Sequence, residues 1–132
     1  MTMRNLTVLD LISVRQATAT VTGADVDLAT STLGFINAGG REVKGHASVG
    51  ISGTDTDETC AVTIEESPTT VSSDFTNIAT FTSVAQEGTD LSEEQHFRIS
   101  PTTNFLRAVA TIAGTTPVFD LHVFVLLEER QA

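Results

Sequence analysis

The chain has 132 residues, a net charge of −10 at pH 7 and a hydrophobic fraction of 40%. This length predicts one domain with room for a hydrophobic core, and the single cysteine, Cys60, excludes an intrachain disulfide. The acidic balance and the lone lysine disfavour anionic partners, so we expect neither nucleic-acid nor membrane binding.

The first sixteen residues have an ambiguous pattern. Leu6, Leu9 and Ile12 would share one face of a helix, but the β-branched residues between them make that helix weak. Residues 1–16 are therefore predicted to form an extended arm or a first strand, and residues 17–132 the folded domain. The segment lacks the features of a secretory signal, so we expect synthesis in the cytoplasm.

Short segments of alternating apolar and polar residues follow, separated by polar or glycine-containing stretches. The segment at 43–52 also has small residues at positions where something could pack closely. The expected strands are Thr18–Val21, Ala24–Leu28, Val43–Ser52, Cys60–Glu65, Phe75–Ser83 and His96–Ile99. The expected connections are Asn37–Gly40, Gly53–Glu58, Ser67–Asp74 and Gln86–Glu94.

Near the C-terminus, two apolar runs flank a turn sequence, Gly114–Pro117. Both runs are rich in β-branched and aromatic residues, which predicts a β-hairpin with strands near Phe105–Ala113 and Val118–Glu128. The second run is apolar on both faces. A strand of this kind is either central and covered, or part of an interface with another chain.

The pattern as a whole indicates an all-β fold. The sequence contains 22 threonines, which suit the solvent-facing side of a strand. Seven or eight short antiparallel strands with frequent turns predict a single-domain sandwich or barrel.

No catalytic signature is present, and we expect neither an enzyme nor a bound cofactor. The three histidines lie on the predicted polar faces of strands, without metal-ligand spacing. The acidic segment Asp55–Glu58 lacks the spacing of a calcium loop and is interpreted as a solvated turn. Cys60 is predicted to be a buried, inert thiol, with Glu58 and Glu65 raising its pKa further.

Two arginines stand in or beside apolar strands. Arg98 and Arg107 could each pair with an acidic side chain across the sheet or across subunits. The simpler alternative is an arginine whose aliphatic stem lies on the surface while its charge reaches solvent.

Three elements between Cys60 and Leu127 resemble a known family. They are a strand leading through a loop to a phenylalanine (Val62–Ser67, Phe75), a Leu-Arg strand (Phe105–Val109) and a Gly-Thr turn into a Phe strand (Gly114–Phe119). In this pattern the chain resembles the capsid cement, or decoration, proteins of tailed bacteriophages, particularly the family typified by a Bordetella phage protein.

This resemblance implies a jelly-roll-like β-sandwich that binds the outer surface of an icosahedral head. It implies the major capsid protein as partner, self-association as a homotrimer, and a virion location. The alternatives are a tail or head-fibre component, or a carbohydrate-binding module, against which the lack of Trp and Tyr argues. From exposure, length and charge, the residues expected to bind partner proteins are Met1, Met3, Arg4, Leu6, Leu9, Arg15, Gly39, Arg41, Arg98 and Arg107.

Overall fold

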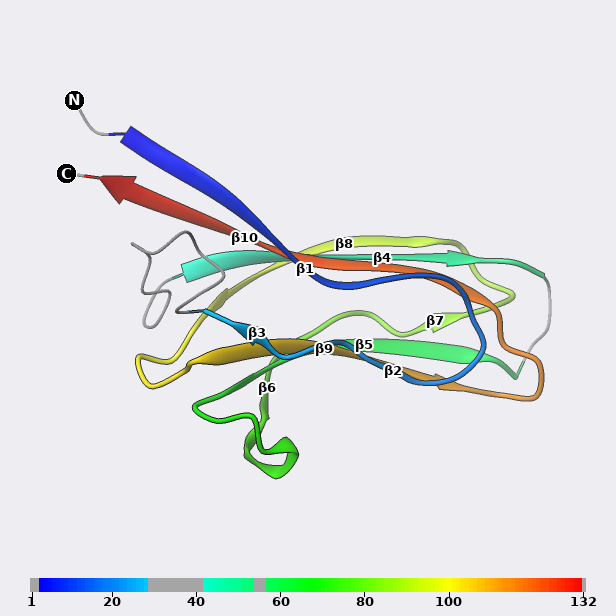
Figure 1. Ribbon diagram of the computed structural model, residues 1–132. Coiled ribbons are helices and arrows are strands. Elements are labelled where there is room, and N and C mark those ends of the chain that lie inside the picture. Colours follow the sequence, from blue (N-terminus) through cyan, green and yellow to red (C-terminus); the bar gives the residue numbers. More distant parts are fainter. Residues whose placement is uncertain (1–2, 29–41, 54–56, 132) are drawn as a thin grey trace.

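Ten strands and one short 3-10 turn, Ser72–Asp74, make up the regular structure of the described residues. The computed structural model describes residues 3–28, 42–53 and 57–131, and describes side chains from residue 8 to residue 127 within those ranges. The strands form two antiparallel sheets packed face to face, as Figure 1 shows. The predicted all-β sandwich is therefore confirmed.

Four strands form the first sheet, called sheet A. Their order across the sheet is β1 (Met3–Ala17), β10 (Phe119–Gln131), β4 (Glu42–Ile51) and β8 (Leu91–Arg98).

Sheet B contains the other six strands. Its main path is β2 (Val21–Thr22), β9 (Phe105–Ala113), β5 (Thr59–Ser67) and β6 (Thr76–Thr80). Two short strands complete it: β3 (Val26–Asp27) pairs with β9, and β7 (Val84–Ala85) pairs with β5. Three of the ten strands have only two residues each, so seven longer strands form the frame, in agreement with the prediction.

The core lies between the sheets and follows the period-two alternation of the strands. On β10, Phe119 and Val123 are completely buried, and on β5, Cys60 and Ile64 face them from the other layer. Gly45 of β4 packs closely against Phe97 of β8 in the same sheet and Ile64 of β5 in the other sheet. A Cβ there would lie 2.7 Å from Phe97 Cε1 and 2.8 Å from Ile64 Cδ1, so these side chains would have to shift to admit a larger residue. The predicted close packing at this strand is confirmed.

The predicted C-terminal hairpin is wrong, although both of its strands exist. β9 belongs to sheet B and pairs with β5, whereas β10 belongs to sheet A and pairs with β1 and β4. The turn sequence therefore carries the chain from one sheet to the other. Gly114 has φ +117°, a conformation that favours glycine, so the predicted change of chain direction is confirmed. The predicted pairing of the two flanking strands with each other is wrong.

Side chains from elsewhere in the chain hold this crossover in place. Glu58, which is 1% exposed, accepts hydrogen bonds at Oε1 from the Thr116 backbone N–H (2.9 Å) and from the Thr116 hydroxyl (3.1 Å). Gln86 is 2% exposed and accepts a hydrogen bond at Oε1 from the Val118 N–H (2.9 Å). These two residues were expected to lie in exposed connections, and the structure corrects that, because both side chains are buried and each accepts a hydrogen bond from a backbone N–H of the crossover.

The start of one further strand differs from prediction. β8 begins at Leu91, not at His96, so half of the expected acidic connection Gln86–Glu94 is strand. The acidic residues concealed this strand because they occupy its solvent-facing and edge positions. The expected loop Asn37–Gly40 lies outside the described residues.

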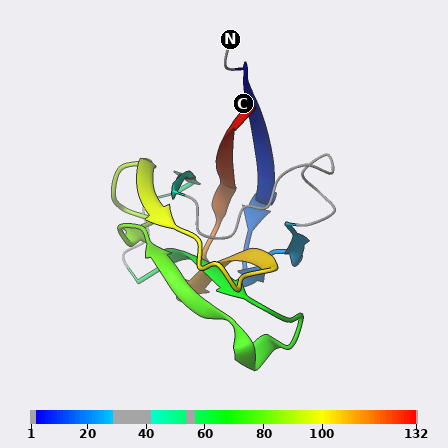
Figure 2. The same ribbon diagram turned by 90° about the vertical axis from the view of Figure 1, so that its left-hand side faces the viewer.

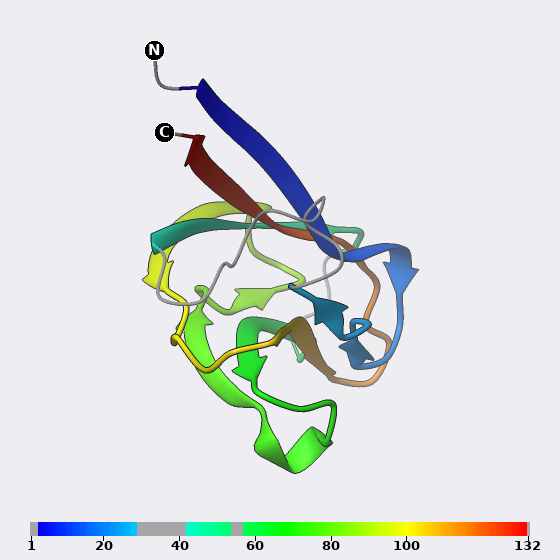
Figure 3. The same ribbon diagram turned by 60° about the vertical axis from the view of Figure 1, so that its left-hand side comes forward.

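The N-terminal segment is a strand that continues past the sandwich. Met3–Thr7 pair with Leu127–Gln131, beyond Leu126, the last residue of β10 that pairs with β4. Figures 2 and 3 show this two-stranded ribbon leaving the body, with both chain ends near its tip.

Candidate functional site: the outer face of sheet A

The solvent-facing side of sheet A carries the greatest variety of chemistry among the described residues. The strand register places Asp10, Phe124, His46 and Glu94 in one row across β1, β10, β4 and β8. The next row contains Val8, Leu126, Lys44 and His96. All three histidines of the sequence lie on this face, as their predicted polar-face positions required.

Phe124 lies between two of these histidines. Its ring stacks on His46 with centroids 5.1 Å apart, and contacts His122 in a tilted arrangement with centroids 5.0 Å apart. His122 Nε2 is 3.0 Å from Asp10 Oδ1 on the neighbouring strand. The partner of His122 is Asp10 and not Asp120 of its own strand, because β1 lies beside β10.

An apolar strip starts at the edge of this face. We define it as Val8, Phe124 and Leu126. Val8 is 53% exposed, and Phe124 and Leu126 are partly exposed on a strand whose other face is buried. Val8 and Leu126 are register partners, so the strip runs across β1 and β10. Strand β10 is central in sheet A, but its outer apolar side chains are partly exposed, so it is not the covered central strand of the first alternative, and the interface with another chain stays a prediction.

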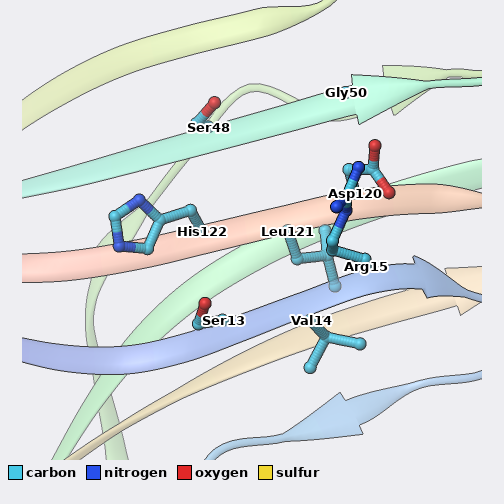
Figure 4. Close-up of a pocket in the computed structure, with 8 residues that line it drawn as sticks. All are labelled: Ser13, Val14, Arg15, Ser48, Gly50, Asp120, Leu121 and His122. Carbon is cyan, nitrogen blue, oxygen red and sulfur yellow. The ribbon is translucent and has the colours of Figure 1, made fainter.

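A shallow pocket of about 350 Å³ lies on the same face, next to the strip. It is lined by Ser13, Val14, Arg15, Ser48, Gly50, Asp120, Leu121 and His122. Figure 4 shows Arg15 near Asp120 at one end of the pocket, and His122 toward the other end. Asp120 Oδ1 accepts a hydrogen bond from the Gln16 backbone N–H (2.8 Å), where β1 has a bulge and Gln16 has φ +54°.

These groups do not form a nucleophile-base-acid arrangement within the described residues. Ser92 Oγ lies 3.3 Å from His46 Nε2, but no described carboxylate hydrogen-bonds to His46 to orient its ring. Nucleophilic catalysis needs that third group and a closer contact. Among the described residues no cluster of three or more His, Cys, Asp or Glu side chains could hold a metal ion.

For several residues expected to bind partners, the structure describes no side chain. Met1, Gly39 and Arg41 lie outside the described residues. Met3, Arg4 and Leu6 are placed as backbone only, in the protruding part of β1.

The other expected partner residues fall into two groups. Arg15 and Arg98 are exposed on sheet A, where a partner could reach them. Leu9 is 5% exposed and belongs to the core, because strand alternation turns it inward opposite Val125.

Arg107 lies on the outer face of sheet B and has internal partners. Its Nε is 2.7 Å from Glu65 Oε1, its register partner on β5, and its guanidinium lies 4.0 Å from the centroid of the Phe75 ring. Its side chain is only 13% exposed. The predicted ion pair with an acidic side chain of the same sheet is therefore confirmed for Arg107, and the alternative of an arginine whose charge reaches solvent is wrong.

Cys60 is buried in the core, and the described part of the acidic turn stabilises the fold through a hydrogen bond of Asp57. Burial raises the pKa of the Cys60 thiol to about 11, so the cause is the apolar surroundings and not the neighbouring carboxylates. Asp57 Oδ2 accepts a 2.6 Å hydrogen bond from the Thr115 hydroxyl, which lowers the pKa of Asp57. The turn thus stabilises the crossover between the sheets. Residues 54–56 of the same turn lie outside the described part of the chain.

Sequence reasoning missed the apolar strip as a unit. Phe124 and Leu126 were assigned to the second apolar face of their strand, but Val8 was assigned to an arm or first strand of undecided structure. The strip exists only because β1 pairs with β10 across the whole length of the chain. No local signal encodes a contact between residues more than one hundred positions apart.

No protein-family profile matches the chain, and no curated protein matches it in sequence. No described helix is long and apolar enough to cross a bilayer.

Proposed function

We propose that this protein is a structural component of a bacteriophage virion, a capsid decoration protein that bridges neighbouring capsid proteins on the outer surface of the head. The proposal includes the jelly-roll arrangement, the homotrimer and the absence of an enzymatic role that the sequence suggested. Its support is the sequence resemblance together with the surfaces of the sandwich.

The observation that carries the proposal is that one β-sandwich presents two open sheet faces of different chemistry. The outer face of sheet A carries the apolar strip, histidines and charges of both signs. The outer face of sheet B carries mainly threonines and apolar residues, among them Phe105, together with the ion pair Glu65–Arg107. A protein that bridges others needs two separate contact surfaces on a stiff body, and two packed sheets supply both.

Bridging in this way is physical and needs no reaction. Each copy removes apolar surface from water at the junction it covers, at about 25 cal/mol per Å² before association costs. One such contact is modest. Repeated over a closed shell, many contacts resist the outward pressure of packaged DNA. The acidic character of the chain suits an exterior protein, because it is not attracted to the genome.

Co-sedimentation with purified mature heads of the phage that encodes the protein tests the proposal. We expect saturable binding at a copy number set by icosahedral symmetry, and heads that then withstand heating better than bare heads. Purified tails from the same phage are the control. Binding to tails alone identifies a tail component, and specific binding on a glycan array without head binding identifies a carbohydrate-binding module.

A further inference from the structure

We propose that the apolar strip, together with the free edge of β1 beside it, is the contact between copies of this chain. The inference rests on the proposed function, because it names the surface through which the proposed oligomer forms.

The first argument is the open edge of β1. In the described residues β1 pairs with β10 on one side only, so its other edge presents backbone donors and acceptors. In its second half this edge is approached by Gly23, which packs closely against the carbonyl of Leu11. The first half, Met3–Asp10, has no such cover from the described residues. Val8 lies within it.

The second argument is the protruding ribbon. Five residue pairs, from Met3–Gln131 to Thr7–Leu127, extend past the last pairing of β10 with β4. An isolated two-stranded ribbon is marginally stable in water. Another strand along its edge would complete the backbone hydrogen bonding, and a second copy always supplies a segment of the right length.

The third argument is charge. The described outer face of sheet A carries three cationic side chains, Arg15, Lys44 and Arg98, and four acidic ones, Asp10, Glu42, Glu94 and Asp120. Three positive and four negative charges leave −1 on this face, out of −10 for the whole chain. Copies of so acidic a protein repel each other. A face with both signs around an apolar strip allows two copies to approach and to form complementary pairs.

The strip offers a matched test, because Val8 and Val71 are the two exposed large hydrophobic residues among the side chains that the structure describes, at 53% and 56% exposure. Val71 lies beside the 3-10 turn, away from sheet A. The variants Val8→Lys and Val71→Lys thus make the same change at equal exposure. Their mass is measured by light scattering and sedimentation equilibrium over a range of concentrations.

We expect the unmodified protein to exceed the monomer mass, Val8→Lys to raise the dissociation constant at least about tenfold, and Val71→Lys to leave it unchanged. A monomer at every concentration, or equal effects of the two variants, overturns the inference. Far-ultraviolet circular dichroism checks that both variants fold.

A measurement on the unmodified protein covers the case in which Val8→Lys fails to fold. Hydrogen–deuterium exchange is compared above and below the dissociation constant. We expect amides around Val8 to exchange more slowly in the oligomer, and amides around Val71 to be unaffected. Equal exchange around Val8 in both states overturns the inference.

The outcomes separate this inference from the proposed function. A monomer that binds heads and loses that binding in Val8→Lys means that the strip contacts the shell, so the inference and the homotrimer fail while the bridging of capsid proteins stands. An oligomer that depends on Val8 but never binds heads means that the proposed function fails.

Discussion

The two sheets have similar inner faces and different outer faces. A row across sheet A reads Asp10, Phe124, His46 and Glu94. A row across sheet B reads Thr22, Val109, Thr63 and Thr80. The first row mixes charge, aromatic rings and histidine, and the second has no charge at all.

This difference shows that the side chains that stabilise the fold and the side chains available to other proteins lie on different faces of the sheets. Both inner faces are lined by buried aliphatic and aromatic side chains that hold the layers together. Threonine on the outer face of sheet B favours strand structure, its hydroxyl group can hydrogen-bond to water, and it adds no charge. The outer face of sheet A carries apolar, histidine and charged side chains that lie outside the core, which is where a contact with other proteins can be built.

The comparison between inner and outer faces is tested most strongly on β10. Phe119 is fully buried, whereas Phe124 is partly exposed on the same strand. We expect Phe119→Ala to lower the free energy of unfolding by about 3–5 kcal/mol, because it leaves a cavity between the sheets. Phe124→Ala is the matched control and should cost less than half as much in the monomer. Urea denaturation of both variants measures the difference, and equal losses would show that the outer ring also belongs to the core.

A pair of glycines on β4 tests the close approach of the two layers. A methyl group at Gly45 would meet Phe97 and Ile64 inside the core, so Gly45→Ala should destabilise the fold by about 1–3 kcal/mol through overpacking. Gly50 faces outward, and its nearest atom to an added Cβ is Asp120 Cβ at 3.4 Å. Gly50→Ala should change stability by less than about 0.5 kcal/mol. A similar loss for both variants in thermal unfolding would contradict the packing described for Gly45.

The polar pairs on the two outer faces should also differ. Arg107 and Glu65 on sheet B are 13% and 21% exposed, whereas His122 and Asp10 on sheet A are 49% and 65% exposed. We expect Arg107→Met to cost about 1–2 kcal/mol, since it leaves a poorly solvated carboxylate without its partner. His122→Ala should cost less than about 0.5 kcal/mol, because solvent screens the exposed pair. Denaturation at low and high salt checks both values, and a larger loss for His122→Ala would reverse this ranking.

The smallest expected effect is on thiol reactivity, which distinguishes the buried inner faces of the sheets from the exposed outer face of sheet A. Because burial raises the pKa of Cys60 to about 11, the folded protein should not react with a disulfide reagent at pH 8 and should react once unfolded. The variant Ser13→Cys, on the outer face of sheet A, should gain one fast-reacting thiol. The folded pKa lies above the unfolded one, so this group favours the folded state at neutral pH, and that contribution is lost as pH rises through about 9 to 11. Fast labelling of native Cys60 would contradict its burial.

Much of the fold was predictable from the sequence, but the candidate site was not. Alternation identified β4, β5, β9 and β10 almost to the residue, because one face of each strand must be buried. It failed at β8, where acidic side chains occupy exposed and edge positions of a strand. Arg107 was singled out correctly, whereas Val8 was not, since its apolar neighbours lie on β10.

The sequence by itself determined where strands form, which of their side chains are buried and where the chain turns, since these properties depend on neighbouring residues. Only the tertiary structure decided which strands pair. Gly114–Pro117 has the sequence of a hairpin turn, yet β9 and β10 lie in different sheets, because buried Glu58 and Gln86 satisfy the backbone groups of the crossover. The same pairing of distant segments, β1 with β10, assembled the apolar strip, which no local pattern could specify.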